Sequence, residues 1–265
     1  MLENILKPGW LEKSPRYAFI IGFIYAIIGI VAALIVFPKS SGIASIAFLS
    51  LLLVPSLAGI LSMEEMQDRN SRKFSLKKIF KDHSDVLEIY LMLFLGIFLA
   101  YALFSLKFPD LLVQGVFDSQ VRAVGINAGS ATGGINFYSI LTNNLKIILI
   151  FFILSLVFGA GSILFLAWNA SVWGIVFGYM ATHYTNALDT FFITFIKIMP
   201  HMFLEVGAYF FAIIAGGIMS QAVLREKLGS GKFDYVMKDG FVFMTVGMIL
   251  LVLGALVEVY VYRLL

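Results

Sequence analysis

His201 and Glu205 are the residues of this chain whose types and spacing most clearly suggest chemistry. They lie four positions apart, directly after Pro200, in an apolar segment that continues to about Ser220. Side chains at i and i+4 face the same side of a helix, so the imidazole and the carboxylate can share one site. An ionisable side chain at bilayer depth costs roughly 2.5–3.5 kcal/mol, so we expect this pair to face the bundle interior or an aqueous cavity.

Two other parts of the chain bring polar groups to the same expected depth. Asn143 and Asn144 open one apolar segment, and Glu258 lies near the end of the last one. Each of these side chains is unfavourable against lipid. We therefore predict that Asn144, His201, Glu205 and Glu258 meet as one hydrogen-bonded site in the outer half of a helix bundle.

Simpler structural roles stay open for the same residues. Asn143 and Asn144 fit a helix cap, because Asn is a preferred N-cap residue. Glu258 fits a side chain that reaches the outer interface and does nothing more. His201 and Glu205 also fit a pair that satisfies its own hydrogen bonds within one helix.

A metal centre or a catalytic site has little support in the sequence. His201, Glu205 and Glu258 could supply three zinc ligands, but the His-Glu-x-x-His motif is absent and the other histidines, His83 and His183, fall in expected loops. The chain has no Gly-x-Ser-x-Gly motif and no phosphate-binding loop. We expect a protein that is not an enzyme, with no cofactor and no resident metal.

The composition predicts the elements that must position these residues. Of the 265 residues, 60% are hydrophobic and only 13% charged, which is outside the range of soluble domains. With no cysteine, the chain has no disulfide framework. We expect an all-α, polytopic transmembrane helix bundle whose partner is the lipid bilayer and not a nucleic acid.

Seven apolar stretches are candidates for crossings, since about 20 apolar residues span a bilayer core. They are residues 16–37, 43–63, 86–106, 144–166, 170–185, 200–224 and 240–262. The fifth is short or broken, and Asn169 is expected in the tight turn before it, as a cap or a partner for backbone groups. Because proline disfavours helix at the preceding residue, we expect the sixth crossing to start at Pro200 and residues 187–198 to form a separate interfacial or re-entrant piece.

The distribution of Lys and Arg predicts the orientation of these crossings. The stretch 64–85 carries six basic residues, whereas 107–141 carries only two. By the positive-inside rule, 64–85 and 225–238 are cytoplasmic and 107–141 is external. The N-terminus is then cytoplasmic and the C-terminus external. We expect three parts: a transmembrane hairpin (1–63), a cytoplasmic basic loop (64–85) and a five-helix membrane core (86–265) with its external loop at 107–141.

Small residues at helical spacing indicate where helices pack closely, because they let backbones approach each other. One such series lies on the fifth expected helix and a longer one on the sixth. The residues are Gly174 and Gly178, then Ala208, Ala212, Gly216 and Ser220. This pattern predicts that the sixth helix is central to the bundle.

From about residue 83 to its end, the chain resembles the stage II sporulation protein M family of integral membrane proteins. The resemblance rests on Phe94-Leu-Gly-Ile-Phe-Leu-Ala-Tyr, Asn143-Asn144, Gly159 with Gly161, Leu166-x-x-Asn169, Gly174, Pro200-His201-x-x-x-Glu205, Ile214-Ala-Gly-Gly217 and Glu258. Family members often have glycine where this chain has Ala170 and Met202. Residues 1–63 lie outside the family's usual five-helix pattern and look like an added hairpin.

The resemblance implies a non-enzymatic membrane scaffold or complex subunit. Bacterial relatives act during spore formation, as membrane components of a complex with peptidoglycan-degrading partners. We accordingly expect other membrane or cell-envelope proteins as partners, and a homo-oligomer stays open. The alternative is a transporter or channel-like protein, because a buried His/Glu pair and an interrupted helix are typical of substrate sites in transporters.

Overall fold

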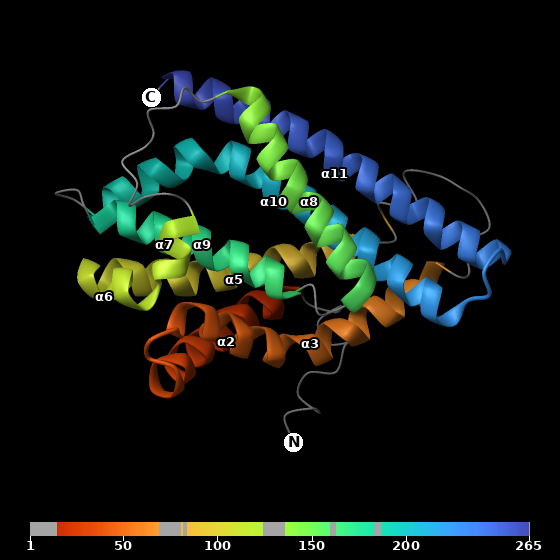
Figure 1. The fold of residues 1–265 in the computed structure, drawn as a ribbon, viewed down its shortest axis with the longest axis horizontal. Helices are drawn as coiled ribbons and strands as arrows, with labels where there is room; N and C mark the ends of the chain where they lie inside the picture. Colours follow the sequence, from red (N-terminus) through yellow and green to blue (C-terminus); the bar gives the residue numbers. More distant parts are fainter. Residues whose placement is uncertain are drawn as a thin grey trace.

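The computed structural model describes residues 15–68, 81, 84–123, 136–159, 163–182 and 187–264. Throughout these residues the regular structure is helical (Figure 1). The helices are α2 (Arg16–Val36), α3 (Ser41–Asp68), α5 (Ser84–Lys107), α6 (Asp110–Val116), α7 (Asp118–Ala123), α8 (Phe137–Phe158), α9 (Ile163–Thr182), α10 (Ala187–Arg225) and α11 (Gly231–Leu264). The expectation of an all-helical fold is confirmed for this part of the chain. Most of the basic loop 64–85, His83, His183 and residues 124–135 of the loop 107–141 lie outside it.

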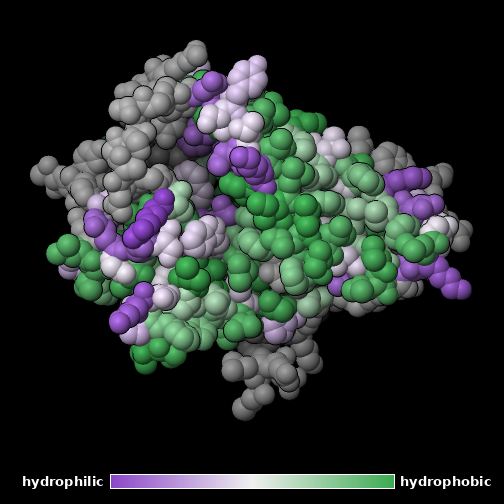
Figure 2. All heavy atoms as spheres, in the orientation of Figure 1, coloured by the Kyte–Doolittle hydropathy of each residue, from purple (hydrophilic) through white to green (hydrophobic). Residues whose placement is uncertain are grey.

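Five of the described helices are long and apolar enough to cross a membrane. These spans are Arg16–Val36, Ser84–Lys107, Phe137–Phe158, Met199–Leu224 and Gly231–Tyr260. The apolar parts of α3 and α9, Ser41–Pro55 and Ile163–Tyr179, are shorter than the roughly 20 residues that a bilayer core needs. Figure 2 shows hydrophobic side chains over the centre of the visible face and hydrophilic ones towards its left and right ends. The count of seven crossings stays a prediction.

The expected boundary between the fourth and fifth crossings was wrong. The helix α8 ends at Phe158, and Gly159 follows with a φ of 54°, in the left-handed region that glycine adopts most easily. The next helix, α9, already begins at Ile163, so Asn169 lies inside a helix and not in a turn before one. Its side-chain Nδ2 donates to the carbonyl of Phe165, 2.9 Å away and one turn earlier.

The candidate span on α10 begins at Met199, close to the expected start of the sixth crossing, but the expected break in the helix before Pro200 was wrong. Residues 187–198 are not a separate piece, because α10 runs unbroken from Ala187 to Arg225 with Pro200 inside it. Proline removes one backbone hydrogen bond, but transmembrane bundles tolerate it where neighbouring helices support the backbone. Here α10 packs against α8, α9 and α11 and extends along most of the molecule (Figure 1). At 1.5 Å per residue it is about 58 Å long, well beyond a core of about 30 Å.

The first part of the loop 107–141 is ordered as the short helices α6 and α7. They dock on the turn between α2 and α3, where Gln120 Nε2 donates to the Gly42 carbonyl at 3.0 Å and Ser41 Oγ donates to the Val116 carbonyl at 3.3 Å. Gln114 Nε2 also donates to the Tyr179 hydroxyl on α9 at 2.8 Å. The ends of α2, α5 and α9 therefore gather at one end of the bundle, at the left in Figure 1.

The predicted small residues lie where helices approach each other closely. A Cβ atom added to Gly174 or Gly178 would lie 2.5 or 2.6 Å from backbone oxygens of α5. A Cβ added to Gly216 would lie 2.6 Å from the Phe152 carbonyl oxygen on α8. Ala208, Ala212 and Ser220 are buried on the same helix as Gly216. The helix α10 is in contact with α3, α5, α8, α9 and α11, which makes it the central element.

Candidate polar site

Glu205 is the buried carboxyl group around which the candidate site is built. It lies on α10, and its side chain is 5% exposed. The amide of Asn144, on α8, donates from Nδ2 to Glu205 Oε1 at 2.5 Å. Glu258, on α11, has its carboxyl group beside that of Glu205. Three different helices therefore meet at this one side chain.

Tyr209 completes the site, and sequence reasoning missed it. Its hydroxyl donates to Asn144 Oδ1 at 3.2 Å, and its side chain is buried. Tyr209 follows Glu205 by four residues, so the two side chains share a face of α10. This spacing was visible in the sequence, but a tyrosine in an apolar helix is common enough that it carries little signal alone. We call Asn144, Glu205, Tyr209 and Glu258 the polar cluster.

Small residues on α11 allow the carboxyl groups to meet. A Cβ on Gly254 would lie 3.1 Å from Glu205 Cγ, and one on Gly247 would lie 3.0 Å from the Ala208 carbonyl oxygen. These glycines bring α11 close to α10 over two turns. Glu258 lies one turn after Gly254, so its side chain reaches Glu205 from the same face.

The proximity of the Glu205 and Glu258 carboxyl groups has a chemical consequence. A carboxylate accepts hydrogen bonds and cannot donate, so the two groups bond to each other only when one of them carries a proton. Asn144 in turn donates to one carboxyl group and accepts from a phenol. Asn144 therefore connects Glu205 and Tyr209 in one buried network, and such networks stabilise a fold when their groups are paired.

His201 lies apart from the polar cluster. Its side chain is 3% exposed, and its ring centroid is 6.3 Å from that of Trp173 on α9. Its Nδ1 atom has no hydrogen-bond partner among the described residues. The structure brings Asn144, Glu205 and Glu258 together, whereas the imidazole one turn before Glu205 contacts a different neighbouring helix.

Asn143 and Asn169 also lie apart from the polar cluster. Asn143 is exposed on α8, next to the buried Asn144. The helix-cap alternative for Asn143 and Asn144 is wrong, since α8 begins earlier and Asn136 caps it by accepting from the backbone N–H of Tyr138 at 3.1 Å. Asn169 bonds to its own helix, as described above. The described residues bring no three His, Cys, Asp or Glu side chains together as metal ligands, and His201, Glu205 and Glu258 form no such set.

The fold and the polar cluster define a helical membrane protein whose central helix is tied to two neighbours by buried polar groups. The chain belongs to the stage II sporulation protein M family, whose model matches residues 89–262 and so includes every member of the polar cluster. It is also similar to an uncharacterized protein of Methanocaldococcus jannaschii, with 30% identity over 129 residues that cover 48% of this chain and 70% of the relative. No solved structure matches the chain.

Proposed function

We propose that this protein is a non-enzymatic integral membrane scaffold or complex subunit. In this proposal it is a multi-pass protein of the cell membrane, with a cytoplasmic N-terminus and an external C-terminus. Its partners are other membrane or cell-envelope proteins, and a second copy of the chain stays open as one of them. The polar cluster then has a structural role, in which its contacts hold α8, α10 and α11 in register.

The observation that carries this proposal is that the centre of the polar cluster is buried and bonded internally. Asn144 and Glu205 are 7% and 5% exposed, Asn144 bonds to both Glu205 and Tyr209, and the half-buried Glu258 lies beside Glu205. Neither of the two cavities described in the structure is lined by a member of the polar cluster. A network whose groups satisfy one another needs no substrate to complete it.

The transporter or channel-like alternative also has one observation in its favour. Glu205 and Glu258 are ionisable groups inside candidate membrane spans, and such groups in membrane proteins often belong to ion or proton pathways. The shared proton between these carboxyl groups would be the feature that such a pathway uses. The two proposals therefore differ in whether protons or ions reach the cluster and leave it.

Proton flux into proteoliposomes, followed with an enclosed pH-sensitive dye, tests the two proposals directly. For the scaffold, we expect the same flux with the protein as in liposomes without it, and no change in Glu205→Gln. A flux above this background that Glu205→Gln abolishes would overturn the scaffold in favour of the transporter. Gln keeps the shape of the Glu205 side chain and its capacity for hydrogen bonds, so this variant removes the titratable proton and retains the contacts between the three helices.

Cross-linking in native membranes, followed by mass spectrometry, tests whether the protein has the partners that a scaffold or complex subunit requires. We expect the same discrete complexes with membrane or cell-envelope proteins in repeated preparations, and the same set with Glu205→Gln. A chain that is recovered only as an uncomplexed monomer would contradict the role of a complex subunit.

A further inference from the structure

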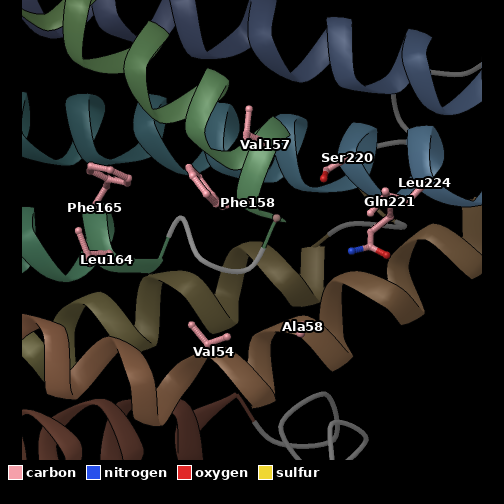
Figure 3. A pocket seen from close by; sticks show the side chains of 10 residues that line it. Val54, Ala58, Val157, Phe158, Leu164, Phe165, Ser220, Gln221 and Leu224 are labelled. Carbon is pink, nitrogen blue, oxygen red and sulfur yellow. The ribbon is translucent and has the colours of Figure 1, made fainter.

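The side-by-side helices α8 and α9 leave a groove between them. The helix α10 packs against both, whereas α8 and α9 have few contacts with each other. Two cavities, of about 510 and 330 Å³, lie along this groove and share Leu164 and Phe165 in their linings. We call them together the α8–α9 groove. Figure 3 shows the larger cavity, with side chains reaching it from α3, α8, α9 and α10.

The groove is mostly apolar, with polar side chains at the end of the larger cavity and with Asn169, whose Nδ2 donates to the Phe165 carbonyl, in the lining of the smaller one. Val157, Phe158, Leu164 and Phe165 supply hydrocarbon walls, while Ser220 and Gln221 supply a hydroxyl and an amide. These two polar groups border Gly159, where an added Cβ would lie 3.8 Å from Ser220 Oγ and 3.7 Å from Gln221 Nε2. The occupant should accordingly have a hydrocarbon part and one polar end.

The polar end lies at the depth of lipid headgroups. Gln221 precedes Leu224, where the candidate span on α10 ends, by three residues, or about 4.5 Å. Beyond it, Lys227 is exposed in the turn that leads to α11. Ester and phosphate oxygens of a lipid are acceptors for the amide and hydroxyl, and a nearby basic residue favours an anionic headgroup.

The size of the groove favours a hydrocarbon chain over a protein helix. A single turn of helix about 10 Å wide and 5.4 Å long occupies on the order of 400 Å³, so these cavities would hold no more than about two turns. A transmembrane partner needs about 20 residues. Both cavities fall within the roughly 300–1,000 Å³ typical of sites for small, mostly apolar ligands.

From these observations we propose that the α8–α9 groove is a binding site for one phospholipid. One hydrocarbon chain fills the groove from Ser220 and Gln221 towards Trp168, and the ester oxygens accept hydrogen bonds from Gln221 Nε2 and Ser220 Oγ. The lipid comes from the leaflet at the end of the bundle where α10 ends and α11 begins. It fills the gap between α8 and α9 and so completes the packing of this side of the molecule.

Trp168, which lines the smaller cavity, is a natural reporter for this site. The other tryptophans, Trp10 and Trp173, are replaced by Phe, and the purified protein is stripped of lipid in detergent. Phosphatidylglycerol with dibrominated chains is then added, since bromine quenches indole fluorescence at short range. We expect quenching of Trp168 that saturates near one lipid per chain. Quenching that rises in proportion to the lipid fraction without saturation would overturn the proposal.

A matched pair of variants tests whether the bound lipid occupies the groove. Leu164→Phe adds a ring at a 40% exposed position that lines both cavities, whereas Ile153→Phe adds the same ring on α8 at a 54% exposed position outside both linings. We expect Leu164→Phe to need at least tenfold more lipid than the parent for half-maximal quenching of Trp168. Ile153→Phe should need the same amount as the parent. Equal behaviour of the two variants would overturn the assignment to this groove.

Two further arms make the test decisive. Ala58→Phe fills the larger cavity from α3 and replaces Leu164→Phe if the latter does not fold. Dibrominated phosphatidylcholine and free dibromostearate separate headgroup recognition from chain binding. Weaker quenching by phosphatidylcholine supports recognition of an anionic headgroup near Lys227, and weaker quenching by dibromostearate supports ester groups at Ser220 and Gln221. Quenching by dibromostearate as strong as by phosphatidylglycerol overturns recognition of a phospholipid.

Discussion

At the scale of single residues, the adjacent amides Asn143 and Asn144 differ in burial: Asn143 is exposed and Asn144 is buried. Both have the same side chain and lie on the same helix, but only Asn144 is buried and bonded to Glu205 and Tyr209. Hydrogen bonds between transmembrane helices contribute about 0.6 kcal/mol on average and up to about 1.7. The local environment and not the residue type therefore decides what each amide contributes.

Replacement of each Asn by Leu tests this difference. Asn144→Leu removes the donor to Glu205 and the acceptor for Tyr209, so we expect a loss of roughly 1–3 kcal/mol in the free energy of unfolding, because buried partners are left unsatisfied. Asn143→Leu is the matched control and should unfold like the parent. Circular dichroism during unfolding in mixed micelles measures both. Equal stability of the two variants would show that the Asn144 bond contributes nothing measurable.

The carboxyl pair gives a second prediction at this scale. Glu258→Gln provides a permanent N–H donor to Glu205, so the hydrogen bond survives and the stability should stay near that of the parent. Glu258→Leu removes the partner and leaves Glu205 with one buried hydrogen bond fewer, so its midpoint of thermal unfolding should fall. A fall of the same size in both variants would mean that the contact between Glu205 and Glu258 does not stabilise the bundle.

At the scale of elements, backbone approach along α10 decides how the bundle packs. Gly216 faces the backbone of α8 closely, whereas an added Cβ at Gly207 would meet only the Leu250 side chain, at an ordinary contact distance of 3.5 Å. Both glycines lie within the same helix, where Ala is intrinsically favoured over Gly by about 1 kcal/mol. They differ in the space that neighbouring helices leave for an added Cβ atom.

We expect Gly216→Ala to destabilise the protein and Gly207→Ala to leave it unchanged or slightly more stable. The larger Gly216→Leu should be more disruptive than His201→Ala, since overpacking costs about 1–3 kcal/mol or more. Thermal unfolding in detergent ranks the four variants. A Gly216→Leu protein as stable as the parent would show that this face of α10 does not pack against α8.

At the scale of the whole molecule, the bundle has two distinct ends. The ends of α2, α5 and α9 gather with α6 and α7 at one of them, and the turn from α10 to α11 lies at the other (Figure 1). The Lys and Arg distribution predicts which of these ends faces the cytoplasm. The same assignment sets the leaflet from which the α8–α9 groove would take its lipid.

Labelling of single cysteines tests this orientation, and the parent chain has no cysteine to give background. Arg122 on α7 and Lys227 after α10 are both exposed. We expect Arg122→Cys to react with a membrane-impermeant maleimide in intact cells and Lys227→Cys to react only after permeabilisation. The reverse pattern would invert the topology and the assigned leaflet.

The sequence by itself determined the class of protein and the residues that require partners. Hydrophobicity over about 20 residues is a local property, so the apolar helices could be located without knowledge of their neighbours. The cost of a buried carboxylate is equally local, which is why Glu205, Glu258 and Asn144 could be singled out in advance. The family relationship followed from the same residues.

Only the tertiary structure decided which side chains meet and where helices continue. Whether a side chain reaches a given neighbour depends on the rotation of its helix and on the neighbour's distance, and small residues such as Gly254 set both. His201 therefore contacts Trp173 on α9, while Tyr209, which the pattern did not single out, bonds to Asn144. Pro200 lies inside α10 at an exposed position, although proline disfavours helix at the residue before it, so the local preference did not decide where α10 begins.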